Sequence, residues 1–149
     1  MIRILMVCLG NICRSPLAEG ILTSKLNPKE FQIDSCGTSN YHIGKKPDTR
    51  SIDIARKHGI DITNQRASQF TVGNFDTYDF IYPMDSANYN DIIKLARNEN
   101  DRKKVKLILE ELNLPTGIDV PDPYYGGDQG FMGVYKMLDE ACTKIAEKL

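Results

Sequence analysis

Residues 6–16 read Met6-Val7-Cys8-Leu9-Gly10-Asn11-Ile12-Cys13-Arg14-Ser15-Pro16. The run before Cys8, from Ile2 to Val7, is short, apolar and rich in β-branched side chains, as in a buried strand. Ser15 followed by Pro16 is typical of a helix N-cap with proline in the first turn. The sequence therefore predicts a strand, a loop and a helix that meet at Cys8.

The loop from Leu9 to Arg14 is expected to bind an anion. If the first strand ends at Cys8, this loop lies at the carboxyl edge of a parallel sheet, where open α/β folds bind their ligands. Gly10 and Asn11 tolerate the left-handed backbone of a tight curl, and the following helix directs its positive end into the same space. Because Arg14 adds a two-pronged donor, we expect a pocket for phosphate or a similar oxyanion beside Cys8.

The Cys8 thiol is a candidate nucleophile if its surroundings stabilise the thiolate. Lowering the pKa of a thiol from about 8.5 to about 5 requires about 5 kcal/mol. A helix end contributes at most about 2 kcal/mol. We therefore expect the loop N–H groups, Arg14 and Ser15 to share this task. An isolated cysteine at a strand end is more often an inert buried thiol, and the rest of the motif favours the catalytic interpretation.

Composition indicates a single domain over residues 1–149. The chain has 41% hydrophobic residues and a net charge of -1, which suffices for one core. Arg3 interrupts the N-terminal apolar run and no stretch reaches the ~18 apolar residues of a membrane span, so we expect a cytoplasmic protein without a membrane partner. The four cysteines are then expected to be reduced. The balanced charge argues against nucleic acid as a partner.

Strand-like and helix-like segments alternate along the chain, which favours a parallel α/β sheet. The strand-like runs cover Ile2–Cys8, Phe31–Cys36, Tyr78–Met84 and Lys104–Leu109. Helices are expected over Ser15–Leu26, Asp48–His58, Ser86–Asn98 and from after Gly130 almost to Leu149. The last helix has an apolar stripe that fits a sheet face, formed by Phe131, Val134, Tyr135, Leu138, Ala141, Ile145 and Leu149.

The segment between Leu114 and Gly130 is expected to be a loop, because it is rich in Pro, Gly, Asp and Tyr. Loops of this length in compact domains are often functional. This one contains Asp122-Pro123-Tyr124-Tyr125-Gly126-Gly127. Asp122 before Pro123 is by itself typical of a turn.

These motifs closely resemble the low-molecular-weight protein tyrosine phosphatases, over essentially the whole chain. Further matches are Gly37-Thr38-Ser39-Asn40-Tyr41 and Met84-Asp85-Ser86-Ala87-Asn88. The resemblance implies an α/β fold in which a four-stranded parallel sheet is flanked by helices on both faces, with a phosphate-binding loop between the first strand and the first helix. It also implies hydrolysis of a phosphotyrosine-containing protein or peptide through a phosphocysteine intermediate, without a metal or other cofactor.

The resemblance assigns roles to individual residues. Cys8 attacks phosphorus, and Asp122 protonates the leaving phenolate and then activates water. Ser15 caps the helix and donates to the thiolate, and Asp85 braces the loop or caps the helix after it. The amides that hold the phosphate together with Arg14 belong to Leu9, Gly10, Asn11, Ile12 and Cys13.

Two groups of side chains around this loop are also assigned by the resemblance. The family usually has a histidine and an arginine where this chain has Gln65 and Ser68, so Gln65 is expected to donate its amide to Asn11 in place of the histidine. The walls of a deep cleft, which would admit a phenyl phosphate and keep phosphoserine away from the nucleophile, are expected to be Tyr41, Tyr124 and Tyr125.

Cys13 is a candidate redox partner of Cys8, since a curled loop can bring the two within disulfide range. In the family this neighbour captures the oxidised nucleophile reversibly, so we expect Cys13 to protect Cys8 from irreversible oxidation. Simple packing of Cys13 is the alternative interpretation.

Two related families share this loop and are alternatives. An arsenate reductase would have additional cysteines after the third strand, and positions 82–100 contain none. Protein-arginine phosphatases have threonine in place of Ile12 and lack the paired tyrosines, so Ile12, Tyr124 and Tyr125 favour phosphotyrosine. A metal-dependent phosphatase is disfavoured, because neither His42 nor His58 belongs to a cluster with ligand spacing.

Overall fold

A three-stranded parallel sheet forms the centre of the computed structural model, which describes residues 1–113, 119–123 and 127–149. The strands are β1 (Ile2–Cys8), β2 (Phe31–Gly37) and β3 (Phe80–Pro83), in the order β2-β1-β3. The last residue of β1, Cys8, pairs with Gly37 at the end of β2. Because β2 and β3 lie on opposite sides of β1, Cys8 occupies the carboxyl end of a strand at a topological switch point.

The four-stranded sheet implied by the sequence is wrong, because the described residues form three strands. Only an isolated parallel bridge joins Ile81 to Val105 where the fourth strand was expected. The Ile81 N–H donates to Lys104 O at 2.9 Å, and the Lys106 N–H donates to Ile81 O at 3.1 Å. The fourth segment therefore lies beside β3, in the expected place, without forming a strand.

A 3₁₀ helix, η1 (Ile108–Leu112), begins three residues after Val105. Ile108 and Leu109 are adjacent in sequence, and both are buried in the core that contains the α6 side chains. A strand would turn adjacent side chains to opposite faces of the sheet. A helical turn buries both in the same core, which explains why the strand pattern stops here.

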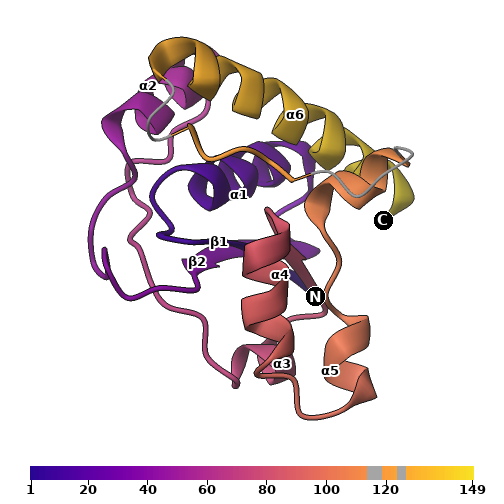
Figure 1. Cartoon of the computed structure of the whole chain (residues 1–149). Coiled ribbons are helices and arrows are strands. Elements are labelled where there is room, and N and C mark those ends of the chain that lie inside the picture. The colour runs from indigo at the N-terminus through magenta and orange to yellow at the C-terminus, as the bar shows by residue number, and fades with distance from the viewer. Residues whose placement is uncertain (114–118, 124–126) are drawn as a thin grey trace.

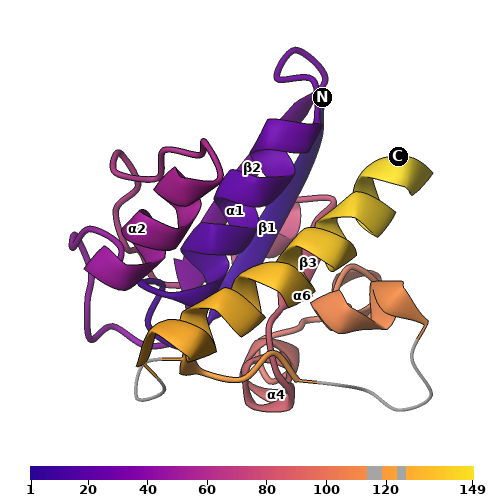
Figure 2. The same cartoon turned by 90° about the horizontal axis from the view of Figure 1, so that it is seen from above.

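Helices cover both faces of the sheet, as the resemblance to the family implies (Figure 1). One face carries α1 (Arg14–Lys25), α2 (Thr49–Lys57) and α6 (Gly127–Lys148). The opposite side carries α3 (Asn74–Thr77), α4 (Ser86–Ile93) and α5 (Glu99–Lys103). Figure 2 shows α1 and α6 packed side by side above the sheet.

The side chains of β1 alternate between two hydrophobic cores. Ile4, Met6 and Cys8 belong to the core beneath α1 and α6, whereas Leu5 and Val7 belong to the core beneath α3 and α4. This alternation is the period of two expected for a strand. It places the Cys8 sulfur on the face of the sheet where α1 begins.

The C-terminal helix α6 has the apolar stripe expected from the sequence. Its side chains from Phe131 to Ile145 are buried at the stripe positions, while Leu149 is 37% exposed. The helix begins at Gly127 rather than after Gly130. The rings of Tyr135 and His58 stack at 4.0 Å and join α6 to α2. No helix among the described residues is long and apolar enough to cross a membrane.

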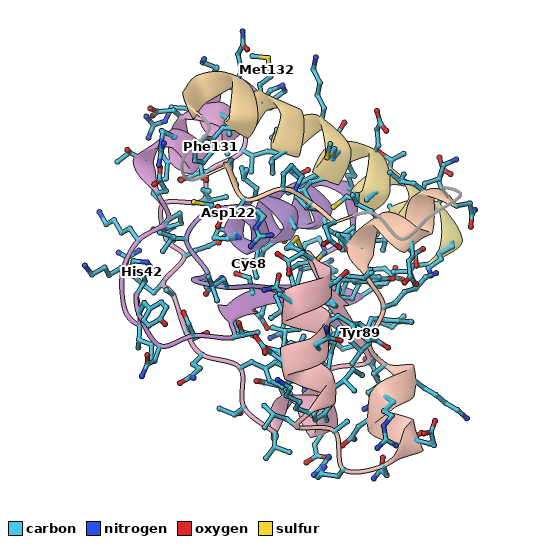
Figure 3. The ribbon with its side chains drawn as sticks, in the orientation of Figure 1. Cys8, His42, Tyr89, Asp122, Phe131 and Met132 are labelled. Carbon is cyan, nitrogen blue, oxygen red and sulfur yellow. The ribbon has the colours of Figure 1, made fainter. Side chains whose placement is uncertain are left out.

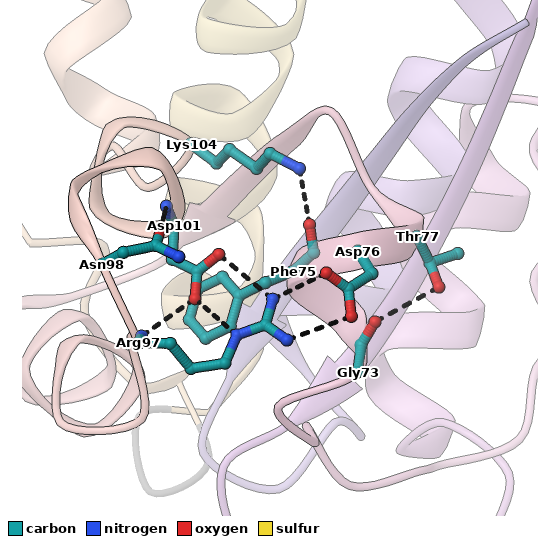
Figure 4. A network of polar contacts seen from close by, with 8 residues as sticks. All are labelled: Gly73, Phe75, Asp76, Thr77, Arg97, Asn98, Asp101 and Lys104. Carbon is teal, nitrogen blue, oxygen red and sulfur yellow. Dashed lines mark hydrogen bonds and ion pairs between the residues drawn. The ribbon is translucent and has the colours of Figure 1, made fainter.

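The single helix expected over Ser86–Asn98 is wrong, because α4 ends at Ile93 and α5 begins at Glu99. The Asn98 side chain accepts a hydrogen bond from Asp101 N at 2.9 Å and so caps α5. An asparagine that caps one helix leaves the conformation of the preceding one. Figure 4 shows Arg97 between Asp76 and Asp101, to which it donates at 2.6 and 2.9 Å. Arg97 therefore connects the segment between α4 and α5 to α3.

Candidate active site

The loop between β1 and α1 has the curled backbone expected of an anion site. Asn11 has a φ of 57°, in the left-handed region that asparagine tolerates better than most residues. Gly10 serves a different purpose from the one expected, since it is not left-handed and a Cβ there would lie 2.9 Å from His42 Cδ2. A Cβ on Gly37 would lie 2.6 Å from Leu9 O, so this glycine lets the loop cross the end of β2.

The Cys8 sulfur lies at the base of a cavity beside this loop. The Asn11 N–H donates to Sγ at 3.2 Å, and Ser15 Oγ lies 3.0 Å from it. Cys8 is only 2% exposed, yet it lines a cavity of about 300 Å³. The cavity is formed by Cys8, Leu9, Gly10, Ile12, Cys13, Arg14, Tyr41, His42 and Asp122. Figure 3 shows Cys8, His42 and Asp122, which come from three separate segments.

The expected helix cap at Ser15 is wrong. Helix α1 already begins at Arg14, and its cap residue, Cys13, makes no side-chain hydrogen bond to the first turn. The Ser15 hydroxyl lies beside the Cys8 sulfur instead, and Ser15 is fully buried. Ser15 therefore contacts the Cys8 thiol and does not cap α1.

Arg14 is a buried cation held at the wall of the cavity. It is 3% exposed, and its Nη1 donates to Asp85 Oδ2 at 2.6 Å and to Val120 O at 2.9 Å. Burial alone would lower the pKa of Arg14, but the Cys8 and Asp85 charges outweigh it and raise that pKa above its ordinary value. The other carboxylate oxygen of Asp85 accepts from Asn88 N at 2.8 Å. Asp85 thus contacts the loop arginine and caps α4 at once.

The segment 119–123 brings Asp122 to the same cavity. Val120 N donates to Met84 O at 2.8 Å, at the end of β3. The Asp119 carboxylate accepts from the backbone N and hydroxyl of Ser86 at 3.0 and 2.8 Å. These contacts, with that from Arg14 to Val120, fix the segment two residues before Asp122, which lines the cavity.

Of the three tyrosines expected to wall the cleft, Tyr41 lines the cavity and is 73% exposed. That exposure places it at the rim rather than in the interior. Tyr124 and Tyr125 lie outside the described residues.

Asn11 is held by a network that differs from the expected one. Its Oδ1 accepts from Ser68 N at 3.0 Å, and its Nδ2 donates to Ser15 Oγ at 2.7 Å and to Ser35 Oγ at 3.0 Å. The expectation that Gln65 donates to Asn11 is wrong, because its amide donates to Pro16 O at 3.1 Å. A backbone N–H takes the place of a side-chain donor, and a backbone donor has no signature in the sequence.

Asn11→Ala is expected to lower the free energy of unfolding by about 3 kcal/mol, since it removes one buried and two partly buried hydrogen bonds and leaves alanine, which tolerates the left-handed region less well than asparagine. Asn11→Gly loses the same hydrogen bonds, but glycine adopts the left-handed backbone without strain. Its free energy of unfolding should therefore be about 1 kcal/mol higher than that of Asn11→Ala. Urea unfolding of both variants measures the two parts. Equal losses in the two variants would mean that the left-handed backbone carries no cost.

Cys13 lines the cavity next to Cys8 and is 5% exposed. Burial raises the pKa of the Cys13 thiol to about 12, with smaller contributions from the charges of Asp48 and Cys8. Cys8, Cys13, Cys36 and Cys142 are all free thiols in this structure. Cys13 is therefore a neutral thiol at physiological pH.

His42 is a cavity residue that the sequence reasoning missed. The sequence indicated His42 only as a possible metal ligand. Within the described part of the chain, no group of three His, Cys, Asp or Glu side chains could hold a metal ion. The available signal was its position directly after Tyr41. A histidine beside an anion pocket offers a further donor to a bound oxyanion.

The site and fold together define a class of protein, an enzyme that transfers an oxyanion group such as phosphoryl through a cysteine. A sulfur at a strand end that contacts a loop N–H and a hydroxyl, with a buried arginine and a carboxylate at the same cavity, suits a nucleophile that attacks a tetrahedral anion. The chain belongs to the low molecular weight phosphotyrosine protein phosphatase family, whose model matches residues 3–149.

Individual relatives agree with this family over nearly the full length. A putative low molecular weight protein-tyrosine-phosphatase from Synechocystis sp. is 38% identical and covers 99% of this chain and 96% of its own. Among solved structures, a protein tyrosine phosphatase from Entamoeba histolytica with Hepes in the active site has a TM-score of 0.92 and 31% identity, over 99% of this chain and 96% of that one. Wzb from Vibrio vulnificus in complex with benzylphosphonate has a TM-score of 0.89 and 30% identity, over 99% of both chains.

Proposed function

We propose that this chain hydrolyses phosphotyrosine in a protein or peptide, without a metal, through a phosphocysteine intermediate at Cys8. The observation that supports this most is the cavity of about 300 Å³ that unites Cys8, Arg14 and Asp122. These residues come from β1, from the start of α1 and from a segment more than a hundred positions later. A nucleophile, a fixed cation and an acid–base group then surround one small volume.

The first step of the proposed reaction is attack of the Cys8 thiolate on phosphorus. The S–P bond forms as the P–O bond to the tyrosine ring breaks, and the electron pair of that bond leaves with the phenolic oxygen. The Asn11 N–H and the Ser15 hydroxyl stabilise the sulfur anion before attack. Arg14, already oriented by Asp85, and the loop amides balance the charge on the equatorial oxygens.

Asp122 is the proposed acid and base of the two steps. A phenolate with a conjugate-acid pKa of about 10 leaves more easily when protonated in flight. Asp122 donates that proton, then removes one from the water that attacks the phosphocysteine. Inorganic phosphate and the free thiolate are the products, so protons balance over one cycle.

The burial of the Cys8 sulfur supports phosphotyrosine as the substrate class. Cys8 is nearly inaccessible at the base of the cavity, while Tyr41 stands exposed at the rim. A phenyl ring spans this depth and presents the phosphate to the loop, whereas the short phosphoserine side chain leaves its phosphate closer to the rim. Tyr41 would contact the ring or the peptide around it.

A substrate panel tests the proposed function and its alternatives. Hydrolysis of matched phosphotyrosine, phosphoserine and phosphoarginine peptides is compared with and without a chelator. We expect turnover of the phosphotyrosine peptide alone, unchanged by the chelator. Preferential turnover of phosphoarginine would favour the protein-arginine phosphatase alternative, and chelator-sensitive turnover would overturn the metal-free reaction.

Cys13→Ser is expected to make oxidative inactivation largely irreversible. Peroxide converts the Cys8 thiolate to a sulfenate, and condensation with the Cys13 thiol would release water and form a disulfide that an added thiol reduces. After peroxide and then dithiothreitol, the native chain should regain most of its activity and Cys13→Ser little. Cys142→Ala, which changes a remote buried thiol, should recover like the native chain. Equal recovery in Cys13→Ser would leave Cys13 a packing residue.

A cytoplasmic location is part of the proposal. The proposed chemistry needs a free thiol at Cys8, and a reducing compartment keeps thiols free.

A further inference from the structure

A continuous chain of hydrogen bonds leads from Cys8 to a carboxyl group on the far side of the loop. Ser15 Oγ lies 3.0 Å from Cys8 Sγ, and Asn11 Nδ2 donates to Ser15 Oγ at 2.7 Å and to Ser35 Oγ at 3.0 Å. The Ser35 hydroxyl donates to Glu19 Oε1 at 2.7 Å. Glu19 lies on α1, outside the cavity that contains the sulfur.

The directions of these hydrogen bonds follow from their partners when Cys8 is a thiolate. The Ser68 N–H can only donate, so the Asn11 atom that faces it is the amide oxygen. Both amide hydrogens of Asn11 therefore point to the two serine oxygens. Each serine accepts from Asn11 and turns its own hydrogen to a third group. For Ser35 that group is Glu19. For Ser15 the acceptors within reach are the Cys8 sulfur at 3.0 Å and Cys36 O at 3.4 Å. A Cys8 thiolate has no proton and can only accept, so Ser15 donates to the sulfur when Cys8 is ionised.

We propose that Glu19 is a positioning residue for the reaction, because it is the terminal acceptor that orients Ser35 and Asn11 and thereby directs the Ser15 hydroxyl hydrogen onto the Cys8 sulfur. Without an acceptor beyond it, the Ser35 hydroxyl is free to turn its hydrogen toward the Asn11 amide. Two facing donors repel, so the Asn11 side chain loses its fixed orientation. Ser15 then stabilises the thiolate less. The inference rests on the proposed role of Cys8 as nucleophile.

The surroundings of Glu19 support this role. Glu19 is partly buried and lines a second cavity of about 740 Å³, together with Asp34, Ser35 and Gln65. Burial raises the pKa of Glu19 to about 7, the Asp34 charge adds to the rise, and the bond from Ser35 opposes it. A carboxyl group with so disfavoured a charge is more common at functional sites than elsewhere. Both ionisation states keep a carboxyl oxygen for Ser35, so the positioning does not require the charge.

This role is separable from a simple effect of charge. A negative charge near Cys8 disfavours the thiolate, so removing the Glu19 charge through space would increase the thiolate fraction. Removing the acceptor would decrease it. The two mechanisms therefore predict opposite signs for Glu19→Ala, and Glu19→Gln separates them further because it removes the charge and keeps an acceptor oxygen.

The test is the rate of alkylation of Cys8 by iodoacetamide as a function of pH, read by mass spectrometry of the Cys8 peptide. This readout does not depend on turnover, so it is independent of the outcome of the substrate panel. We expect Glu19→Ala to move the half-maximal pH upward by about one unit, which is about tenfold less thiolate below that pH. Glu19→Gln should stay close to the native chain. Thermal unfolding of each variant verifies that it is folded.

Two further variants make the result decisive. Ser35→Ala removes the hydroxyl that connects Asn11 to Glu19, so it should reproduce the upward shift of the half-maximal pH. In the double variant, adding Glu19→Ala should raise the half-maximal pH no further. Asp34→Asn is the matched control, since it removes a charge from the same cavity without touching the bond between Ser35 and Glu19. An unchanged or lower half-maximal pH in Glu19→Ala, or the same upward shift in Glu19→Gln, would overturn the proposal.

Discussion

Cys8→Ser is expected to abolish hydrolysis of phosphotyrosine, with kcat/KM at least about 10⁴-fold lower than in the native chain. A serine hydroxyl is not ionised at neutral pH, so the Asn11 N–H and the Ser15 hydroxyl have no anion to stabilise. The cavity keeps its arginine and its loop amides, so phosphate binding should persist. Steady-state kinetics with a phosphotyrosine peptide, and calorimetric titration with inorganic phosphate, measure the two properties separately.

The matched control for this experiment is Cys13→Ser, which makes the same atomic change in the same loop. It should retain most of the turnover in the absence of oxidant, because Cys13 is neutral and does not attack phosphorus in the proposed reaction. Turnover that survives in Cys8→Ser, or that is lost equally in Cys13→Ser, would show that the nucleophile has been assigned to the wrong residue.

Asp122→Ala is expected to lower kcat for a phosphotyrosine peptide by about 10²–10⁴-fold, the range for loss of a general acid. The size of the loss should depend on the leaving group. An aryl phosphate whose phenol is much more acidic than tyrosine needs little protonation as it leaves, so its first step should be nearly unchanged. Pre-steady-state release of the phenol from both substrates measures this first step directly.

The control for Asp122 is Asp53→Asn, which alters a largely exposed aspartate on α2 and should leave both substrates unaffected. An equal loss for the two leaving groups would assign Asp122 a structural role in the segment that Arg14 and Ser86 hold in place. Unchanged turnover of the peptide would remove Asp122 from the mechanism.

The parts of the fold that sequence patterns could predict are those set by local signals. The strand that ends at Cys8, the helix after it and the buried stripe of α6 follow from hydrophobic periodicity within one segment. The fourth strand and the single helix over Ser86–Asn98 were predicted wrongly. At both places, contacts with residues outside the local segment decide which structure forms. The run after Val105 is buried as a helical turn near α6 rather than as a strand, and the break before Glu99 depends on where the Asn98 side chain bonds.

The candidate site divides in the same way. Cys8 and Arg14 could be proposed from residue types and spacing, and Asp122 from the resemblance to the family. All three line one cavity. The Ser68 backbone donor to Asn11 could not be proposed, because a backbone group leaves no trace in residue identity. The contact of Ser15 with the thiol was expected, whereas the absence of its capping role depends on α1 beginning at Arg14. The need for glycine at position 37 could not be predicted either, because it arises only where the loop after β1 crosses the end of β2.

The central claim is that phosphorus becomes bonded to the Cys8 sulfur during turnover. Its most direct test is to mix the native chain with excess phosphotyrosine peptide, quench within one turnover and examine the Cys8 peptide by mass spectrometry. We predict one phosphoryl group on that peptide, formed as fast as the first equivalent of tyrosine product and removed as turnover proceeds. A Cys8 peptide that stays unmodified while product forms, or a phosphoryl group on another residue, would contradict the account.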